Sequence, residues 1–209
     1  FDCDYTAGCL VMAGAQTMTL ILASASPRRR ALLQQIGVET FVAPVAIDET
    51  PWHDEAARDY VQRMAAEKAA AAWPQHGGTR ALLAADTIGE LDGEILIKPR
   101  DRVDAETMLQ RMSGRAHTIM TAVSLISDRG LSSILCTTKV VFRQLDKDLI
   151  RAYVATGEAN DKAGAYGIQE RGAVLVDRIE GSYSNVVGLP LAETLQLLKQ
   201  QGLGTDWYE

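Results

Sequence analysis

A short apolar run that leads almost directly into a helix start constrains this fold more than any other feature of the sequence. Residues 19–22 read TLIL, and small polar residues connect them to Ser26 and Pro27. Serine is a favoured N-cap, proline suits the first helical position, and Gly37 is placed to end the helix. We therefore predict a buried strand that feeds a helix through a tight turn.

Three consecutive arginines, Arg28, Arg29 and Arg30, occupy the first turn of this predicted helix. Each cation there opposes the helix dipole, at a cost of about 0.3–1 kcal/mol. A bound polyanion would resolve the conflict, because backbone N–H groups, the dipole and guanidinium groups together bind phosphate. We predict this role for Arg28 and Arg29, with Ser24 as a further donor, and assign Arg30 to solvent. The alternative is that the arginines simply lie in solvent or pair with distant carboxylates.

Strand and helix signals alternate along the rest of the chain, and Asp92–Gly93 between two apolar runs indicates a hairpin. Because hairpins exclude a purely parallel sheet, we predict an α/β or α+β fold with a long mixed sheet flanked by helices. One further helix is expected to begin at residue 57, and three others are expected over residues 104–114, 146–157 and 190–202. The further expected strands are 40–46, the two arms of 81–99, 117–127, 135–145 and 173–181.

Composition narrows the class of protein. The 209 residues carry a net charge of −6, which argues against general nucleic-acid binding. No apolar run approaches the roughly 18 residues that span a bilayer, and no leader-like segment begins the chain, so we expect a cytoplasmic protein. The three cysteines show no metal-type spacing and are expected to be reduced, with Cys136 in a buried strand. We expect residues 1–17 to be an upstream extension and residues 18–209 to form one compact unit.

Lys68 is out of place in the helix that begins at Ala57. At 100° per residue it falls in the middle of the apolar stripe, so its side chain should point inward. A buried lysine is rarely tolerated without a partner. Snorkelling along the stripe is the alternative explanation.

Asp86, Thr87 and Lys98 belong to the predicted hairpin. Asp86 ends an apolar run, where a carboxylate needs a ligand or a cation nearby. A two-residue Asp92–Gly93 loop would place Thr87 opposite Lys98, whereas a three-residue loop would place Asp86 there. Taken alone, an Asp-Thr pair in a strand is more often structural than functional.

Glu49 follows an apolar strand, as Asp86 does, so both carboxylates could sit at strand ends around one cleft. Asp48 is expected to be its solvated neighbour. Two carboxylates among several cations suit Mg²⁺ or Mn²⁺ acting on a phosphate chain. They do not suit zinc, because the three histidines lack ligand spacing.

Residues 161–169, DKAGAYGIQ, combine two glycines with Gln169. The glycines permit unusual backbone angles, and the glutamine amide offers both a donor and an acceptor to the edge of a base. Alone, this stretch is a weak signal, because such a sequence is more often an ordinary loop.

Taken together, the motifs ASASPRR, DET, EKA, ADT, KP, SG, DKAGAYGIQ and EGSYSNVVGLPL strongly resemble the Maf family of nucleotide pyrophosphatases, over about residues 19–202. The chain looks like the dTTP/UTP branch, because arginine follows Pro27, Thr87 follows the aspartate and GAYGIQ ends in Gln169. Departures from the family pattern are Ala85, where glycine is usual, and Gly89, where a strand hydrophobe is typical.

The resemblance implies a fold similar to inosine triphosphate pyrophosphatases, with two lobes and a central cleft. It also implies roles for the residues singled out above. Asp86 matches the catalytic aspartate; Arg28, Thr87 and Gln169 match specificity positions; and Glu49, Arg29, Lys68 and Lys98 match the phosphate and metal pocket.

The resulting hypothesis is hydrolysis of dTTP and UTP between the α and β phosphates, with Asp86 and Glu49 as catalytic and metal-holding groups and Mg²⁺ or Mn²⁺ as cofactor. Which carboxylate takes the proton is left open. The expected partner is a nucleoside triphosphate, with neither nucleic acid nor membrane, and a homodimer stays open. The alternative is a nucleotide-binding regulator of septum formation with little turnover.

Overall fold

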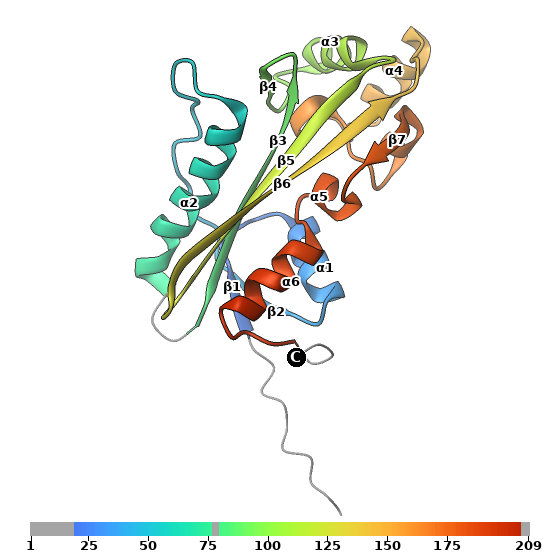
Figure 1. The fold of residues 1–209 in the computed structure, drawn as a ribbon. Coiled ribbons are helices and arrows are strands. Elements are labelled where there is room, and N and C mark those ends of the chain that lie inside the picture. The colour runs from blue at the N-terminus through green and yellow to red at the C-terminus, as the bar shows by residue number, and fades with distance from the viewer. Residues whose placement is uncertain (1–18, 77–79, 206–209) are drawn as a thin grey trace, which may run out of the picture.

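The computed structural model describes residues 19–76 and 80–205, which form a seven-stranded mixed sheet flanked by helices (Figure 1). The strand order is β2-β1-β3-β5-β6-β7, and β4 pairs with β3 outside this path. β1 is parallel to β2 and β3, and the other pairs are antiparallel. The predicted mixed sheet is thus confirmed. The strands are β1 Thr19–Leu22, β2 Glu39–Val42, β3 Leu82–Leu91, β4 Glu94–Leu96, β5 Ala116–Ser127, β6 Gly130–Phe142 and β7 Val176–Glu180.

The helices lie where the capping and periodicity signals predicted them, with three short additions. They are α1 Pro27–Gln35, α2 Ala57–His76, α3 Arg102–Met112, α4 Lys147–Ala155, α5 Tyr183–Val187 and α6 Leu191–Gln200. The short α5 was not predicted, and two 3₁₀ turns cover Ala163–Ala165 and Arg171–Leu175. At α1, the Ser26 hydroxyl accepts a hydrogen bond from the backbone N–H of Arg29, and Gly37 takes a φ of 73° just beyond the end of the helix.

Side chains of the long strands alternate between two packed faces. On β3, Leu83 and Ala85 pack in the cluster that also holds residues of α1 and α6. Leu82, Ala84 and Ile88 point the other way and pack with residues of α2. A further cluster joins α3 and α4 to β5 and β6 at the opposite end of the sheet (Figure 1). This alternation decides which side of the sheet each functional residue of β3 faces.

The edge of β3 opposite β5 has two separate partners. β1 pairs with β3 only as far as Leu83, and β4 pairs with it from Gly89 onward. Within the described residues, no strand pairs with residues 84–88 of β3 on this side. This gap contains Asp86 and Thr87, so side chains from both faces of the sheet can reach one opening.

Several element boundaries differ from the sequence prediction. The hairpin has the two-residue Asp92–Gly93 loop, but its ladder ends at the Gly89–Leu96 pair, so Lys98 lies beyond β4 and opposes neither Thr87 nor Asp86. The strand predicted over residues 173–181 begins only at residue 176, because the preceding residues wind into a 3₁₀ turn.

Gly89 has a packing reason in this chain. A Cβ atom at this position would lie 3.1 Å from the Cβ of Leu96, tighter than ordinary contact. The missing side chain thus lets β4 approach β3 closely.

The expected extension of residues 1–17 lies outside the described residues. None of the helices in the described part of the chain is long and apolar enough to cross a lipid bilayer.

Candidate active site

A cleft with a volume of about 890 Å³ opens beside the gap in the sheet. All nine site residues predicted from the sequence line it: Ser24, Arg28, Arg29, Glu49, Lys68, Asp86, Thr87, Lys98 and Gln169. Arg30, which was assigned to solvent, is exposed and absent from the lining. These nine residues comprise four cations, two carboxylates and three neutral polar side chains, and Lys162, Glu158, Asp161 and Glu170 also line the cleft.

Lys68 holds the two carboxylates together. Its side chain is only 11% exposed, and its Nζ lies 2.7 Å from both Oδ1 of Asp86 and Oε1 of Glu49. The inward direction predicted for Lys68 is confirmed, and the partners it requires are these two acids. An ammonium group has three N–H donors, so one stays available for a ligand oxygen.

The expectation that Asp86 ends its strand is wrong. Asp86 lies inside β3, which continues to Leu91 because β5 pairs with β3 along its length. By the alternation of the strand it faces α2, and the side chain is 15% exposed. The expectation that Glu49 sits at a strand end is also wrong, because Glu49 lies in the loop between β2 and α2.

The charge state of Glu49 follows from its neighbours. Partial burial alone would raise its pKa, but the hydrogen bond and charge of Lys68 lower it, and Lys98 and Arg29 add to this effect. The net result is a Glu49 pKa below its usual value. Glu49 is therefore a carboxylate anion at neutral pH.

Arg29 is held from three directions at the α1 side of the cleft. Nε donates to the carbonyl of Gly188 at 2.9 Å, Nη1 to Oγ of Ser24 at 3.1 Å and Nη2 to Oγ1 of Thr87 at 3.0 Å. Burial lowers the pKa of this guanidinium, and the carboxylate of Asp86 partly offsets that effect. Each terminal nitrogen keeps one further N–H, so Arg29 is a fixed donor for an anion.

The hydroxyl of Thr87 is committed within the protein. Thr121 can donate its own hydroxyl to the carbonyl of Asn185 at 3.0 Å. In the 2.9 Å contact between the two threonine oxygens either hydroxyl can be the donor, and Thr87 can also donate to the carbonyl of Gly188 at 3.4 Å. Thr87 accepts from Arg29, and its one hydroxyl hydrogen has an acceptor within the protein in either arrangement.

The other predicted residues line the outer parts of the cleft. Arg28 forms an ion pair of 3.6 Å with Asp161, which joins α1 to the loop after α4. Lys98 and Gln169 are exposed and have open access to the cleft. In the 161–169 segment, Gly164 has the expected positive φ, 72°, whereas the second residue with a positive φ is Ala165, at 61°, and not Gly167.

The donor set for a divalent cation is small. Within residues 19–76 and 80–205, no group of three or more His, Cys, Asp or Glu side chains is placed to hold a metal ion. Glu49 and Asp86 nevertheless share one ammonium and thus lie close together. Mg²⁺ is commonly held by one or two carboxylates together with substrate phosphates and water. The two acids fit that mode and do not fit an all-protein cage.

Sequence reasoning missed three contributors. Tyr60 packs in the apolar cluster of α2, and its hydroxyl also donates to the carbonyl of Glu49 at 2.8 Å. Asp161 pairs with Arg28, and the carbonyl of Gly188 orients Arg29. A backbone carbonyl has no signal in a sequence, and the carboxylate of Asp161 resembled that of any loop residue.

The family profile described as "Maf-like protein" matches residues 19–201. The chain belongs to the Maf family. Its Maf relatives include proteins named dTTP/UTP pyrophosphatase in Myxococcus xanthus, 48% identical over 92% of this chain and 97% of the relative, and in Shewanella oneidensis, 52% identical over 89% and 100%. The resemblance drawn from the motifs is thereby confirmed.

Among solved structures, this Maf chain is similar to a nucleoside-triphosphatase / dITP/XTP pyrophosphatase from Mycobacterium abscessus. The identity is 17%, over 61% of this chain and 76% of the other, with a TM-score of 0.39. That similarity is too low to support a conclusion about the site.

Proposed function

We propose that the protein hydrolyses dTTP and UTP, and modified pyrimidine nucleotides of the same shape, to the monophosphate and pyrophosphate. The observation that carries the proposal is the Lys68 ammonium bridging Asp86 and Glu49, in a cleft that Arg28, Arg29 and Lys98 also line. The names of the family relatives support the substrate assignment.

In the proposed reaction a water molecule attacks the α-phosphorus. The bond between this phosphorus and the bridging oxygen breaks, pyrophosphate leaves, and the water proton passes to one of the two carboxylates. Asp86 is our first candidate for this base, because it matches the catalytic aspartate of the family and keeps one oxygen that Lys68 does not occupy.

The cationic side chains of the cleft bind the phosphates of the nucleotide. Arg29 and the third N–H of Lys68 donate to phosphate oxygens whose charge grows as the bond breaks, while Arg28 and Lys98 bind the outer phosphates. A Mg²⁺ or Mn²⁺ ion held by Glu49 and Asp86 would supply charge neutralisation and lower the pKa of bound water.

Base selection falls to Gln169, whose amide N–H can donate to the O4 carbonyl of a pyrimidine. Thr87 contributes by holding Arg29, since its hydroxyl hydrogen already has an acceptor within the protein, either Thr121 or the carbonyl of Gly188. The sequence hypothesis that Thr87 reads the base directly is therefore modified in this proposal.

The test is a panel of ribo- and deoxynucleoside triphosphates with Mg²⁺ or Mn²⁺, in which pyrophosphate and orthophosphate are measured separately. We expect pyrophosphate and monophosphate in equal amounts, with dTTP and UTP preferred. Release of orthophosphate alone would overturn the assigned bond. Tight nucleotide binding without turnover would favour the alternative of a nucleotide-binding regulator, which needs the cations but not the two acids.

A further inference from the structure

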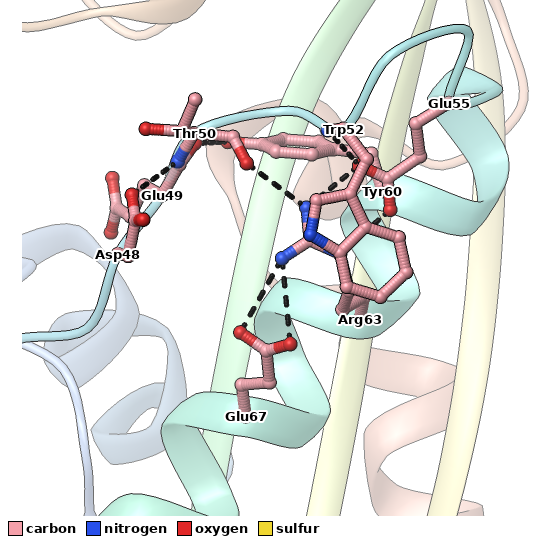
Figure 2. A network of polar contacts seen from close by, with 8 residues as sticks. All are labelled: Asp48, Glu49, Thr50, Trp52, Glu55, Tyr60, Arg63 and Glu67. Carbon is pink, nitrogen blue, oxygen red and sulfur yellow. Dashed lines mark hydrogen bonds and ion pairs between the residues drawn. The ribbon is translucent and has the colours of Figure 1, made fainter.

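We propose that Arg63 is a positioning residue that fixes the Glu49-bearing loop over the cleft, and thereby sets the affinity of the site for its divalent cation. The effect of Arg63 on cation affinity rests on the proposed function. Its effect on the conformation of the loop does not depend on activity. Figure 2 shows the network in which Arg63 lies at the centre.

The loop from residue 43 to residue 56 has no helix or strand of its own. Long segments of this kind in compact domains are commonly functional, and they need external contacts to hold one conformation. Glu49 lies in the middle of this loop, and its side chain is 55% exposed. The loop therefore depends on neighbouring side chains to keep Glu49 beside Asp86.

Arg63 of α2 supplies those contacts with its whole guanidinium. Nε and Nη2 donate to the two carboxylate oxygens of Glu55, each at 2.7 Å, and Nη2 also donates to the carbonyl of Thr50 at 3.2 Å. Nη1 lies 3.4 Å from both oxygens of Glu67. The indole of Trp52 covers the guanidinium, with Cζ of Arg63 4.1 Å from the ring centroid.

These contacts leave Arg63 unsuited to bind phosphate. Its donors are engaged, its charge is balanced by Glu55 and Glu67, and it is absent from the residues that line the cleft. The side chains of Arg63 and Glu55 are only 12% and 5% exposed. Paired charges of this kind hold the groups bonded to them in one orientation. A guanidinium that bonds both oxygens of a carboxylate fixes the relative orientation of the two groups, which an ammonium group does not.

The contacts converge on the backbone around Glu49. Tyr60 donates to the carbonyl of Glu49, and Arg63 donates to the carbonyl of the next residue, Thr50. Glu55 also accepts from the backbone N–H of Trp52 at 2.9 Å. Two consecutive carbonyls are thus tied to one helix, the helix that also carries Lys68. Figure 2 shows these groups around the loop.

Supporting groups behind a metal ligand typically change metal affinity by about 10- to 100-fold when removed. For Arg63→Met we therefore expect the Mg²⁺ or Mn²⁺ concentration that gives half-maximal activity to rise about 10-fold or more. Activity should approach that of the unmodified protein at saturating metal. Arg63→Lys should rescue only part of this shift, because the three N–H donors of an ammonium cannot replace the five contacts of the guanidinium with Glu55, Thr50 and Glu67. Arg58→Met, an exposed change on the same helix, is the matched control.

The second readout is hydrogen–deuterium exchange of the loop, which needs neither metal nor turnover. We expect Arg63→Met to speed exchange of the Trp52 and Glu55 amides about 10-fold or more while leaving β5 and β6 unchanged. Glu55→Ala, which removes the partner of Arg63 and not Arg63 itself, should do the same and covers the case in which Arg63→Met fails to fold.

The results distinguish failure of the loop role, of the link to the cation and of the proposed function. Loop exchange equal to that of the Arg58→Met control in both variants would overturn the loop role. Faster loop exchange with an unchanged metal requirement would overturn the link to the cation. If the unmodified protein hydrolyses no nucleotide, the proposed function fails and the metal link with it, and the exchange experiment still decides whether Arg63 holds the loop.

Discussion

The Nζ atom of Lys68 lies 2.7 Å from Oδ1 of Asp86, and this contact joins the helix α2 to the strand β3 inside the cleft. The same atom lies 2.7 Å from Glu49, so a single cation organises a helix, a strand and a loop. One oxygen of each carboxylate is occupied by the ammonium. The other oxygens are free to act on water or a cation.

Asp86→Asn keeps an oxygen that can accept from Lys68 but cannot take a proton from water. We expect turnover to fall by about 10² to 10⁴, while the dissociation constant for dTTP changes by only a few-fold. Single-turnover kinetics and calorimetric titration measure the two effects. Asp148→Asn, at an exposed position on α4, is the control. Unchanged turnover would remove Asp86 as the base.

Lys68→Met removes the hydrogen bond and the charge that lower the pKa of Glu49. The Glu49 pKa should therefore rise, so Glu49 should lose its charge at a higher pH than in the unmodified protein. The acid limb of the pH profile of residual kcat/KM should move upward in pH. Lys147→Met on α4 should leave the profile in place. An acid limb that stays fixed in Lys68→Met would show that it belongs to another group.

Thr121→Val tests the hydroxyl chain behind Arg29. The variant leaves the carbonyl of Asn185 without its donor, which should lower the free energy of unfolding by about 1–3 kcal/mol. Because the chain acts on Arg29, kcat/KM should fall by the same factor for UTP, dTTP and CTP. A changed preference among the three bases would contradict this explanation and return Thr87 to base reading. Thr118→Val on the same strand is the control.

His117 makes the fold sensitive to acid. It is 3% exposed, its Nε2 lies 2.8 Å from the hydroxyl of Tyr166, and burial lowers its pKa to about 4. Between this value and the pKa near 6.5 of the unfolded chain, the unfolded state binds more protons, so stability falls as pH falls through this window. The His117 contribution lost between pH 7 and pH 5 is about 2 kcal/mol.

Urea unfolding at the two pH values measures this loss. In His117→Gln the difference between pH 7 and pH 5 should shrink by that amount, whereas in His53→Gln it should stay, because His53 is exposed. An unchanged pH dependence in His117→Gln would assign the acid sensitivity to other groups.

Local rules were sufficient for part of the site. The Ser26 cap, the cations on the first turn of α1 and the inward direction of Lys68 all follow from neighbours within one helix. The same holds for the Asp92–Gly93 loop, which two residues define.

Other parts depended on contacts that no local pattern contains. Asp86 was expected to end a strand because its apolar run ends there, but pairing with β5 carries β3 further. Glu49 lies in a loop without periodicity, so its meeting with Lys68 came from the family resemblance and not from spacing. Arg63 went unremarked because an exposed helix face and a buried ion network share the same residue types.

The hydrogen bond from Arg29 to the carbonyl of Gly188 spans 159 positions along the chain. The arginine is therefore synthesised long before its acceptor, and the anion pocket can close only after Gly188 has been added to the chain. Contacts between residues so far apart in the sequence slow folding. The segments synthesised first stay without their native partners until the later segments are made. A nascent chain stalled before Gly188 would lack one of the three acceptors that hold the arginine, so a truncated product could not carry the complete pocket.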